Sequence, residues 1–303
     1  MRVRLLQPFR VVFYAPIEVA QRGGFLATEG LELEVTITGS SPRYLEALSR
    51  GEADIAMGGP MRTMKWVEEG HRADLVNFAE VNSRSGFFLL SRTPQPDFQP
   101  TALVGKEVIT FAEAPTPWFC LQAVLRRHGV DPAQVPCLTD LPTPVAVETF
   151  LHGRADYLLQ TEPVVERLVQ DGTAFLCMAQ AEDCGHLAFT SYITATTTLH
   201  TQPELIERFT RAVYRTQQWM AHHSAAEIAQ AIQASFPDIP VDTLGAAVER
   251  FQQLATWPAD PVLRREGFEN LAEVLRLAGY LTASPSYDAL VDTSIARRVV
   301  QAG

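Results

Sequence analysis

The sequence predicts an α/β protein built as two lobes with a helical C-terminal tail. Length is the first reason, since 303 residues exceed the roughly 150 of one typical domain. The second reason is a repeat: a G-x-A-D turn at 51–54 recurs at 153–156, and each copy follows a helical pattern and leads into an apolar strand. Two lobes of one αβ architecture would explain the repeat, as would a single recurrence of a generic β-α-β unit.

The first part of the chain alternates strand and helix patterns. Residues 31–37 alternate apolar with polar side chains, which is typical of a strand that buries one face. Pro60 fits the first position of a helix, because the N–H that proline lacks has no partner there. The elements expected here are strands at 31–37, 53–57, 74–81 and 86–91 and helices at 42–50 and 60–69.

A Pro-rich loop at 93–100 separates this part from a second series, which changes to helices alone after residue 198. Thr201 and Ser224 each precede a glutamate by three residues, which predicts capping boxes at two helix starts. The expected elements are strands at 107–111, 157–159 and 187–195 and helices at 117–128, 145–151, from 164, 203–221, 225–234, 242–255 and 262–278.

The repeat and the tail together predict the domain limits. Residues 90–190 would form lobe II, inserted into a lobe I made of residues 1–89 and 191–303. The chain would then cross between the lobes twice, near 86–91 and near 187–196. We expect these two crossings to form a hinge.

Charge and hydropathy exclude several classes of protein. The formal net charge is −10, which disfavours nucleic acid as a partner because the surface field repels polyanions. No stretch reaches the roughly 18–20 apolar residues of a membrane helix. The N-terminus lacks the apolar core of a signal peptide, so we expect either a cytosolic protein or one whose leader has been removed.

No metal site, cofactor or catalytic residue is expected. The four cysteines, Cys120, Cys137, Cys177 and Cys184, include no C-x-x-C pair and fit buried thiols better than a disulfide framework or a zinc site. The cysteines do not indicate whether the protein works in an oxidising or a reducing compartment. The histidines lack H-x-x-x-H spacing, and the G-x-S-x-G, Walker and G-x-G-x-x-G motifs are missing.

A ligand site is expected where the strand ends and helix N-termini of the two lobes face each other. Backbone N–H groups and helix dipoles converge at such an edge and can hold a polar or anionic ligand. The candidate ligand-binding residues are Phe9, Tyr14, Ser40, Ser41, Gly58, Gly59, Arg62, Glu80, Asn82, Thr110, Glu113, Thr116, Trp118, Gln160, Glu162 and Tyr192.

The serines and glycines among them have structural alternatives. Ser40 and Ser41 would either cap a helix or donate to a ligand oxygen. Gly58 and Gly59 would either make a strand-to-helix turn or let a ligand approach the backbone closely.

The larger candidates also have two interpretations each. Tyr14 and Trp118 would stack on a flat ligand or pack in the core. Glu113 and Glu162 would accept hydrogen bonds from a ligand N–H group or face solvent. Arg62 would pair with a ligand carboxylate, sulfonate or phosphate, or with a neighbouring acid. Whether the ligand is a sulfonate, a carboxylate or a pyrimidine-like molecule stays open.

Residues 14–35 resemble the opening of the solute-binding proteins of sulfonate, nitrate, taurine and thiamine-precursor ABC importers. They contain Ala-Pro, a hydrophobic stretch, Ala-Gln, a Gly-Phe pair and then Glu-Gly-Leu before an alternating strand. The two G-x-A-D turns, the strand at 86–91 and the segment G-K-E-V at 105–108 continue the resemblance in the same order.

The resemblance implies a type II periplasmic binding protein fold, in which two lobes, each a mixed sheet flanked by helices, close on a small polar or aromatic molecule. It implies an extracytoplasmic receptor without enzyme activity that delivers its ligand to an ABC permease in the membrane. A monomer in the periplasm is the expectation, and the cytoplasm is the alternative.

The alternative function on the same scaffold is a cytosolic thiamine-pyrimidine synthase-like enzyme that uses pyridoxal phosphate. Such relatives carry a lysine and a histidine at positions that align here with Gly58 and Arg62, and a cysteine-rich run whose region reads CGHLAFTSY at 184–192. Both signatures are missing, so Lys65 or Lys106 would have to form the aldimine.

Overall fold

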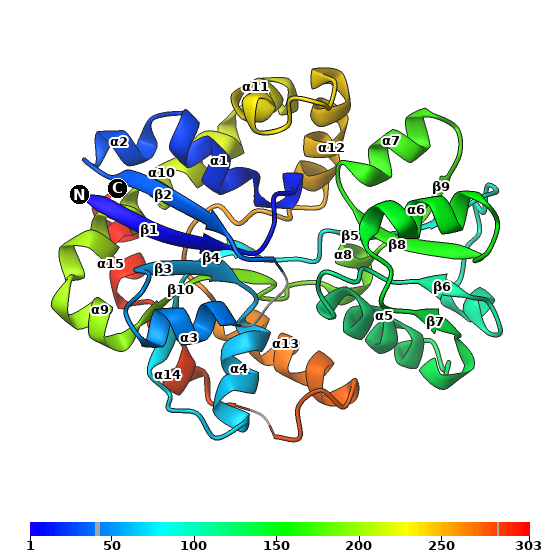
Figure 1. The fold of residues 1–303 in the computed structure, drawn as a ribbon, viewed down its shortest axis with the longest axis horizontal. Helices are drawn as coiled ribbons and strands as arrows, with labels where there is room; N and C mark the ends of the chain where they lie inside the picture. Colours follow the sequence, from blue (N-terminus) through cyan, green and yellow to red (C-terminus); the bar gives the residue numbers. More distant parts are fainter. Residues whose placement is uncertain (40–42, 284) are drawn as a thin grey trace.

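Two five-stranded sheets form the two halves of the molecule (Figure 1). The computed structural model describes residues 1–39, 43–283 and 285–303. Within these residues the first sheet has the strand order β2-β1-β3-β10-β4 and the second has the order β7-β6-β8-β5-β9. The predicted α/β class with two mixed sheets flanked by helices is confirmed.

The first sheet combines strands from the N-terminal part with one strand from beyond the second sheet. In it β1 pairs in parallel with β2 and β3, whereas β10 runs antiparallel to β3 and β4. The elements of this half are β1 (Arg2–Gln7), α1 (Ala15–Arg22), α2 (Phe25–Thr28), β2 (Glu32–Ile37), α3 (Arg43–Ser49), β3 (Ile55–Gly58), α4 (Pro60–Glu68), β4 (Leu75–Asn82), β10 (Thr190–Ala195), α9 (Thr196–Thr201), α10 (Pro203–His222) and α15 (Ser294–Ala302).

The second sheet repeats this topology. Its β6 pairs in parallel with β7 and β8, and β5 runs antiparallel to β8 and β9. The elements of this half are β5 (Phe87–Ser91), β6 (Val108–Ile109), α5 (Thr116–Arg127), β7 (Cys137–Leu138), α6 (Thr143–Leu151), β8 (Tyr157–Thr161), α7 (Val164–Gln170), β9 (Phe175–Ala179) and α8 (Gln180–Cys184).

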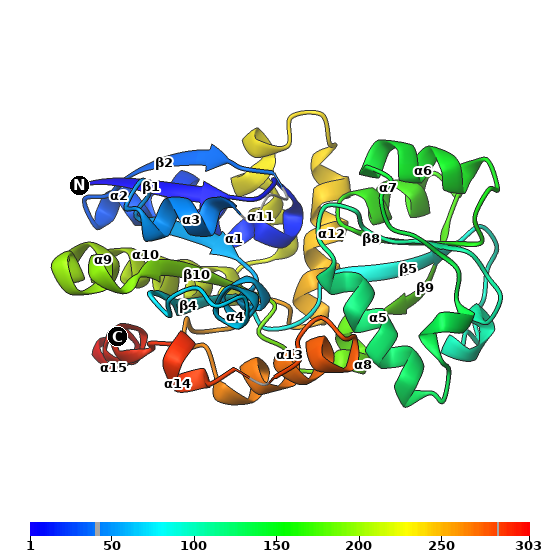
Figure 2. The same ribbon diagram turned by 60° about the horizontal axis from the view of Figure 1, so that its bottom comes forward.

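The C-terminal tail is helical, as predicted, and part of it lies between the halves. In both ribbon views α12 runs along the junction (Figures 1 and 2). The tail comprises α11 (Ala225–Ile232), α12 (Val241–Gln253), α13 (Arg265–Leu277) and α14 (Tyr287–Leu290), besides α10 and α15. Short 3₁₀ turns occur at Val12–Tyr14, Pro100–Leu103, Pro132–Gln134 and Gln233–Ser235.

The chain crosses between the halves in two segments that run side by side. The N–H of Leu187 donates to the carbonyl of Ser83 at 2.8 Å, and the N–H of Phe189 donates to Asn82 at 3.0 Å. The expected crossings at 86–91 and 187–196 fall largely inside β5 and β10, so the connecting segments are 83–86 and 185–189. The strand that follows each crossing is the antiparallel strand of the sheet that it enters: β5 in the second sheet and β10 in the first. The residue limits 1–89, 90–190 and 191–303 stay a prediction.

Of the two predicted capping boxes, one is present in the structure and the other is not. The capping box at Ser224 is confirmed, because its hydroxyl accepts from the N–H of Glu227 at 3.3 Å while the Glu227 carboxylate accepts from the N–H of Ser224 at 2.8 Å. The box at Thr201 is wrong: its hydroxyl donates to the carbonyl of Thr197 at 2.8 Å, because residues 196–201 already form α9. Strand β1 was not expected, although its exposed arginines alternate with the buried Val3 and Leu5.

An aromatic cluster fills the junction where the crossings meet the core. The Phe13 ring lies 5.4 Å from that of Phe189 and 5.7 Å from that of Phe251 on α12. Gly86 is required beside it, because a Cβ atom there would lie 2.3 Å from the Phe13 ring. The two halves therefore share one continuous core of buried residues.

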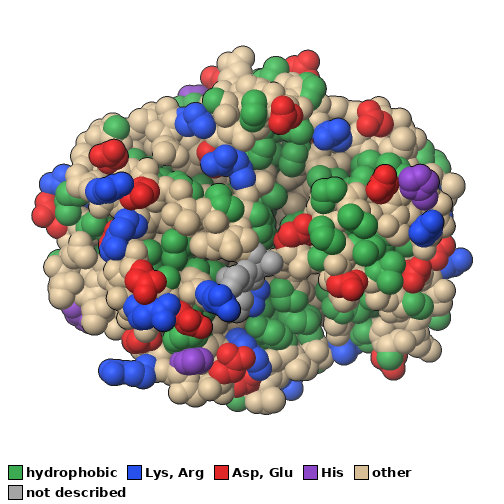
Figure 3. Space-filling view, in the orientation of Figure 1, with side chains coloured by type: hydrophobic (Ala, Val, Ile, Leu, Met, Phe, Trp, Pro, Cys, Tyr) green, Lys and Arg blue, Asp and Glu red, His purple; other side chains and the backbone are tan. Residues whose placement is uncertain are grey.

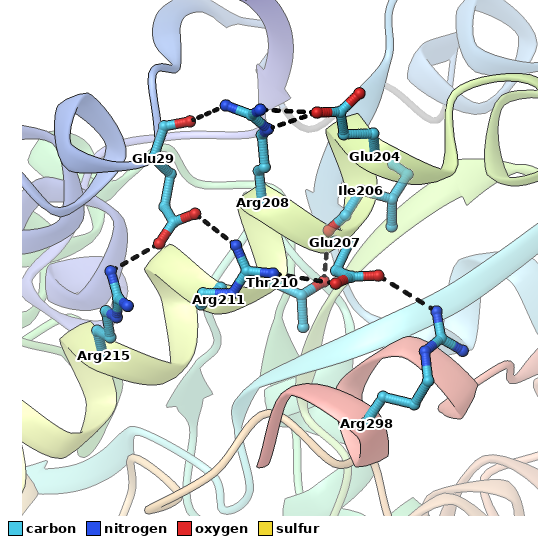
Figure 4. A network of polar contacts seen from close by, with 9 residues as sticks. All are labelled: Glu29, Glu204, Ile206, Glu207, Arg208, Thr210, Arg211, Arg215 and Arg298. Carbon is cyan, nitrogen blue, oxygen red and sulfur yellow. Dashed lines mark hydrogen bonds and ion pairs between the residues drawn. The ribbon is translucent and has the colours of Figure 1, made fainter. Parts of the chain in front are cut away.

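An ion-pair network fastens α10 to the loop after α2, away from this junction (Figure 4). The Glu29 carboxylate is 7% exposed and accepts from Arg211 at 2.8 Å and from Arg215 at 2.7 Å. Arg208 donates to the carbonyl of Glu29 at 3.0 Å. These contacts hold α10 against the N-terminal part of the chain.

Candidate functional site

A narrow cleft with a cavity volume of about 50 Å³ lies between the two halves. The surface is hollowed where the halves meet, and hydrophobic side chains gather beside the hollow (Figure 3). We call this the interlobe cleft. It is lined by Pro8, Phe9, Tyr14, Gly39, Tyr44, Gly58, Gly59, Met61, Arg62, Glu113, Ala114, Pro115, Thr116, Phe189 and Thr190.

Aromatic rings form one wall of the interlobe cleft. The rings of Phe9 and Tyr14 stack with centroids 5.5 Å apart, and Phe9 meets Phe111 edge-on at 5.6 Å. Burial raises the pKa of the Tyr14 hydroxyl far above its ordinary value, and a hydrogen bond with Thr190 opposes this rise. A neutral hydroxyl and two ring faces are suited to an uncharged, flat part of a ligand.

Arg62 supplies positive charge to the interlobe cleft. It lies in the first turn of α4, close to the hydroxyls of Tyr44 and Tyr280. Burial raises the pKa of both tyrosines, and the nearby Arg62 guanidinium opposes the rise. Because both phenols stay neutral donors, an anion beside Arg62 would meet no fixed negative charge from them.

Gly58 and Gly59 take part in packing beside the cleft. A Cβ atom on Gly58 would lie 2.3 Å from the Tyr44 hydroxyl, so the tyrosine occupies the space that the missing side chain leaves. A Cβ atom on Gly59 would lie 3.2 Å from the carbonyl of Phe189. Gly58 therefore admits Tyr44 to the strand end, and Gly59 admits the second crossing.

The second half contributes the loop before α5. One oxygen of Glu113 accepts the N–H of Thr143 at 2.9 Å, while Oε2 is buried without a hydrogen-bond partner among the described residues. The hydroxyl of Thr116 donates to Met61 Sδ, which joins the halves across the cleft. The α4 and α5 helices both begin at the cleft, so two positive helix ends meet there.

A side pocket of about 240 Å³ adjoins the cleft and shares Phe9 and Glu113 with it. Gln160 and Glu162 line this side pocket, but their polar atoms bind within the protein. The Gln160 amide donates to Thr143 Oγ1 at 3.1 Å. The Glu162 carboxylate accepts the N–H of Glu166 at 2.9 Å and is also bound by the Arg250 guanidinium.

Glu162 belongs to a buried ion-pair cluster that links α12 to the second half. Arg250 also donates to Glu166 at 2.6 Å, and its guanidinium lies 5.7 Å from the ring centre of Phe88. Glu162 is fully buried, and this burial raises the pKa of its carboxyl to about 7 although Arg250 opposes the rise. Glu162, which was predicted to accept a hydrogen bond from a ligand, therefore binds Arg250 instead.

Five predicted residues lie outside both cavities. Asn82 donates to the carbonyl of Phe13 at 2.9 Å, and Thr110 donates to that of Leu138 at 3.4 Å. Trp118 packs against the core from α5, and the Tyr192 ring is buried beside Phe209 at 4.8 Å. Asn82, Thr110 and Tyr192 are buried, and Trp118 is partly buried against the core.

Glu80 is the fifth. Its carboxylate is fully buried, Oε1 lies 3.7 Å from His186 Nε2, and burial raises the pKa of the carboxyl. His186 is part of the second crossing, and the adjacent carboxyl raises the pKa of its ring. Glu80 therefore faces the crossing rather than either cavity.

Two further predicted residues, Ser40 and Ser41, lie outside the described residues. The sequence reasoning missed Tyr44, Met61, Phe189 and Thr190, which line the cleft. Phe189 and Thr190 could have been predicted, because they stand at the start of the expected strand 187–195. An antiparallel strand begins at the edge of the sheet where its parallel neighbours end. Tyr44 gave no such signal, since its helical spacing is that of a core residue.

The site does not fit pyridoxal phosphate held as a lysine aldimine. The chain has two lysines, and neither lines the interlobe cleft. Lys65 is held by Glu68 at 2.7 Å and by the carbonyl of Tyr280 at 3.0 Å, and Lys106 lies 3.9 Å from Asp156 on the second half. Among the described residues no group of His, Cys, Asp and Glu could hold a metal ion, and no helix there is long and apolar enough to cross a membrane.

A two-lobed α/β molecule with paired crossings and a cleft between its halves has the architecture of a periplasmic binding protein. The profile of the NMT1/THI5-like family matches residues 13–226, more than half of the chain. The chain therefore belongs to this family, in agreement with the resemblance seen in its motifs.

Known relatives are mostly binding proteins. "Putative binding protein YtlA" of Bacillus subtilis (strain 168) is 26% identical over 299 residues, which cover 98% of this chain and 90% of YtlA. The periplasmic aliphatic sulphonate binding protein SsuA of Escherichia coli is 15% identical with a TM-score of 0.75, over 99% of this chain and 97% of SsuA.

One structural neighbour is an enzyme. The desulfurization enzyme DSZB is 16% identical with a TM-score of 0.70, over 99% of both chains. At these identities the structural likeness shows the fold alone, whereas the family and YtlA support a solute-binding role.

Proposed function

We propose that this protein is the solute-binding receptor of an ABC importer, working outside the cytoplasmic membrane and handing its ligand to a permease without transforming it. The observation that carries the proposal is the interlobe cleft, which takes its walls from both halves and from the second crossing. A ligand that contacts both halves stabilises the closed arrangement, because it binds that arrangement more tightly than an open one.

The charges of the two walls support a proposal for the ligand class. Arg62 and the start of α4 lie on the first half and suit a sulfonate or carboxylate group. Glu113 lies on the second half, and its buried Oε2 needs a donor. We propose a small molecule that carries an acidic group for Arg62 and an N–H group for Glu113.

The enzyme alternative has less support. Pyridoxal phosphate chemistry of the expected kind requires a lysine at the cofactor, and both lysines have partners away from the cleft. Adding pyridoxal phosphate is expected to produce no aldimine absorbance band that depends on Lys65 or Lys106. A band lost in Lys65→Met or Lys106→Met would favour the enzyme.

Native mass spectrometry of the purified protein would detect a retained ligand first. Calorimetric titration with 2-aminoethanesulfonate, ethanesulfonate and an aminopyrimidine would then separate the two ends of the ligand. We expect 2-aminoethanesulfonate to bind most tightly. Arg62→Gln should weaken its binding by about 10-fold or more, since a charge-assisted hydrogen bond contributes roughly 1.5–3 kcal/mol.

Matched variants sharpen this test. Glu113→Gln should weaken 2-aminoethanesulfonate but not ethanesulfonate, and Arg72→Gln, at an exposed position away from the cleft, should change neither. Equal affinity of both sulfonates would contradict the proposed ligand class. Turnover of a bound molecule, rather than its release unchanged, would contradict the receptor itself.

A further inference from the structure

Two cysteines meet where helix α8 packs against helix α5. The side chain of Gln180, at the start of α8, donates to the carbonyl of Pro117 in α5 at 2.8 Å. Arg127, at the end of α5, donates to the carbonyl of Asp183 near the end of α8 at 2.6 Å. Between these contacts the side chains of Cys120 and Cys184, both buried, lie close enough to interact with each other.

The position of this pair links the cleft to a crossing. Helix α5 begins at Thr116, which lines the interlobe cleft. Cys184 is the last residue of α8, and Gly185, with φ of 64°, starts the second crossing. The amide of Asn270 on α13 donates to the carbonyl of Cys184 at 3.2 Å, so the same residue also contacts the helical tail.

The other two cysteines have separate partners. Cys177 donates to Ser91 Oγ at 3.0 Å, and Cys137 donates to the carbonyl of Val135 at 3.4 Å. All four thiols are reduced in the structure. Cys120 and Cys184 are therefore the pair that the fold places in contact, although 63 residues separate them in the sequence.

The two thiols also differ in character. The interaction with Cys120 lowers the pKa of Cys184, with a further contribution from the Arg127 guanidinium, whereas the interaction with Cys184 and burial raise the pKa of Cys120. Cys120 is fully buried and Cys184 is 3% exposed. Cys184 is the last residue of a helix of only five residues, so local opening of α8 would expose Cys184 first and let it react.

We propose that Cys120 and Cys184 form a redox-active pair that closes to an intramolecular disulfide by exchange with a small organic disulfide. The Cys184 thiolate attacks one sulfur of the oxidant, whose S–S bond breaks and releases one thiolate, which takes up a proton. Cys120 then loses its proton and attacks Sγ of Cys184, which releases the second thiol. Two protein thiols are oxidised, and one disulfide is reduced to two thiols.

The bond would pin the start of the second crossing onto α5. Because α8 has only five residues, a covalent link at its last residue restrains the whole helix together with Gly185. A cross-link that encloses a long loop also removes freedom from the unfolded chain. The oxidised protein should therefore unfold at a temperature several degrees higher than the reduced protein.

The test uses the full chain incubated with glutathione disulfide, quenched in acid, unfolded and alkylated. Of the four thiols, two should become resistant to alkylation, with a mass loss of about 2 Da before alkylation and a peptide cross-link between Cys120 and Cys184. Cys137→Ser and Cys177→Ser should leave this cross-link intact. Alkylation of all four thiols, or a different pairing, would overturn the proposal.

Variants of the pair complete the test. Cys184→Ser should abolish the cross-link and the rise in unfolding temperature on oxidation. Cys120→Ala should abolish the cross-link but leave a mixed disulfide between glutathione and Cys184. If Cys120→Ala fails to fold because this position is fully buried, Cys184→Ser alone decides: a rise in unfolding temperature that persists in it would contradict the assignment.

Discussion

The two G-x-A-D units occupy equivalent places in the two sheets, yet their anchors differ in strength. In the first, the Asp54 carboxylate accepts from the N–H of Arg4 at 2.8 Å and from its guanidinium at 2.6 Å. In the second, Asp156 accepts the N–H of Glu107 at 3.0 Å, and Lys106 lies 3.9 Å away. Both aspartates tie their turn to the neighbouring parallel strand, but only the first has a close ion pair.

The loops after the two strands differ more. The first copy ends in Gly58 and Gly59 beside the interlobe cleft, where Tyr44 and the second crossing fill the space. The second copy ends in Gln160 and Glu162, whose polar atoms bind inside the protein. The same unit therefore serves as a cleft wall in one half and as an anchor for α12 in the other.

The largest expected effect comes from removing that anchor. Arg250→Ala should lower the free energy of unfolding by about 3–5 kcal/mol, because Glu162 is fully buried and would lose its compensating charge. Urea denaturation would measure the change.

Arg276→Ala provides the matched control. Arg276 pairs with Glu273 at 2.8 Å, but both side chains are about half exposed, so this substitution should cost less than about 1 kcal/mol. Equal losses in the two variants would contradict the role given to the Glu162 cluster.

The next effect is a pH dependence of stability. The pKa of Glu162 is about 7 in the folded protein against an ordinary 4.5, so between these values the folded state binds more protons than the unfolded state. The free energy of unfolding from this group therefore falls as pH rises through that window, by on the order of 3 kcal/mol in total.

Glu162→Gln isolates this contribution. The variant keeps the pair between Arg250 and Glu166, but it no longer titrates at position 162. Its unfolding free energy, measured by denaturation between pH 4.5 and 7, should fall less steeply than that of the unmodified protein. Parallel curves would show that Glu162 ionises normally.

The local pattern was enough to predict the fold class and much of the cleft. Alternation at 31–37, the two G-x-A-D turns and the prolines that open helices all depend on neighbouring residues, and the structure has strands and helices there. Strand ends next to helix starts then placed Phe9, Tyr14, Arg62, Glu113 and Thr116 at the cleft edge.

Pairings between distant residues could not be predicted in this way. Nothing near Glu162 in the sequence indicates Arg250, and nothing near Cys120 indicates Cys184. The sheet to which β5 and β10 each belong likewise depends on strand partners that lie far away in the sequence. Gln160 and Glu162 were therefore assigned to a ligand although partners within the protein already bind their polar atoms.

The smallest expected difference concerns the two aspartates themselves. Although burial opposes it, Arg4 holds the pKa of Asp54 below its ordinary value, so the charged carboxylate stabilises the fold and this contribution is lost as the pH falls. Asp54→Ala should cost about 2 kcal/mol at neutral pH, since charged hydrogen bonds contribute roughly 1.5–3 kcal/mol. Asp156→Ala should cost less than about 1 kcal/mol, because its side chain is 40% exposed and Lys106 is distant. Chemical denaturation of both variants measures the difference, and a larger loss in Asp156→Ala would reverse the ranking of the two anchors.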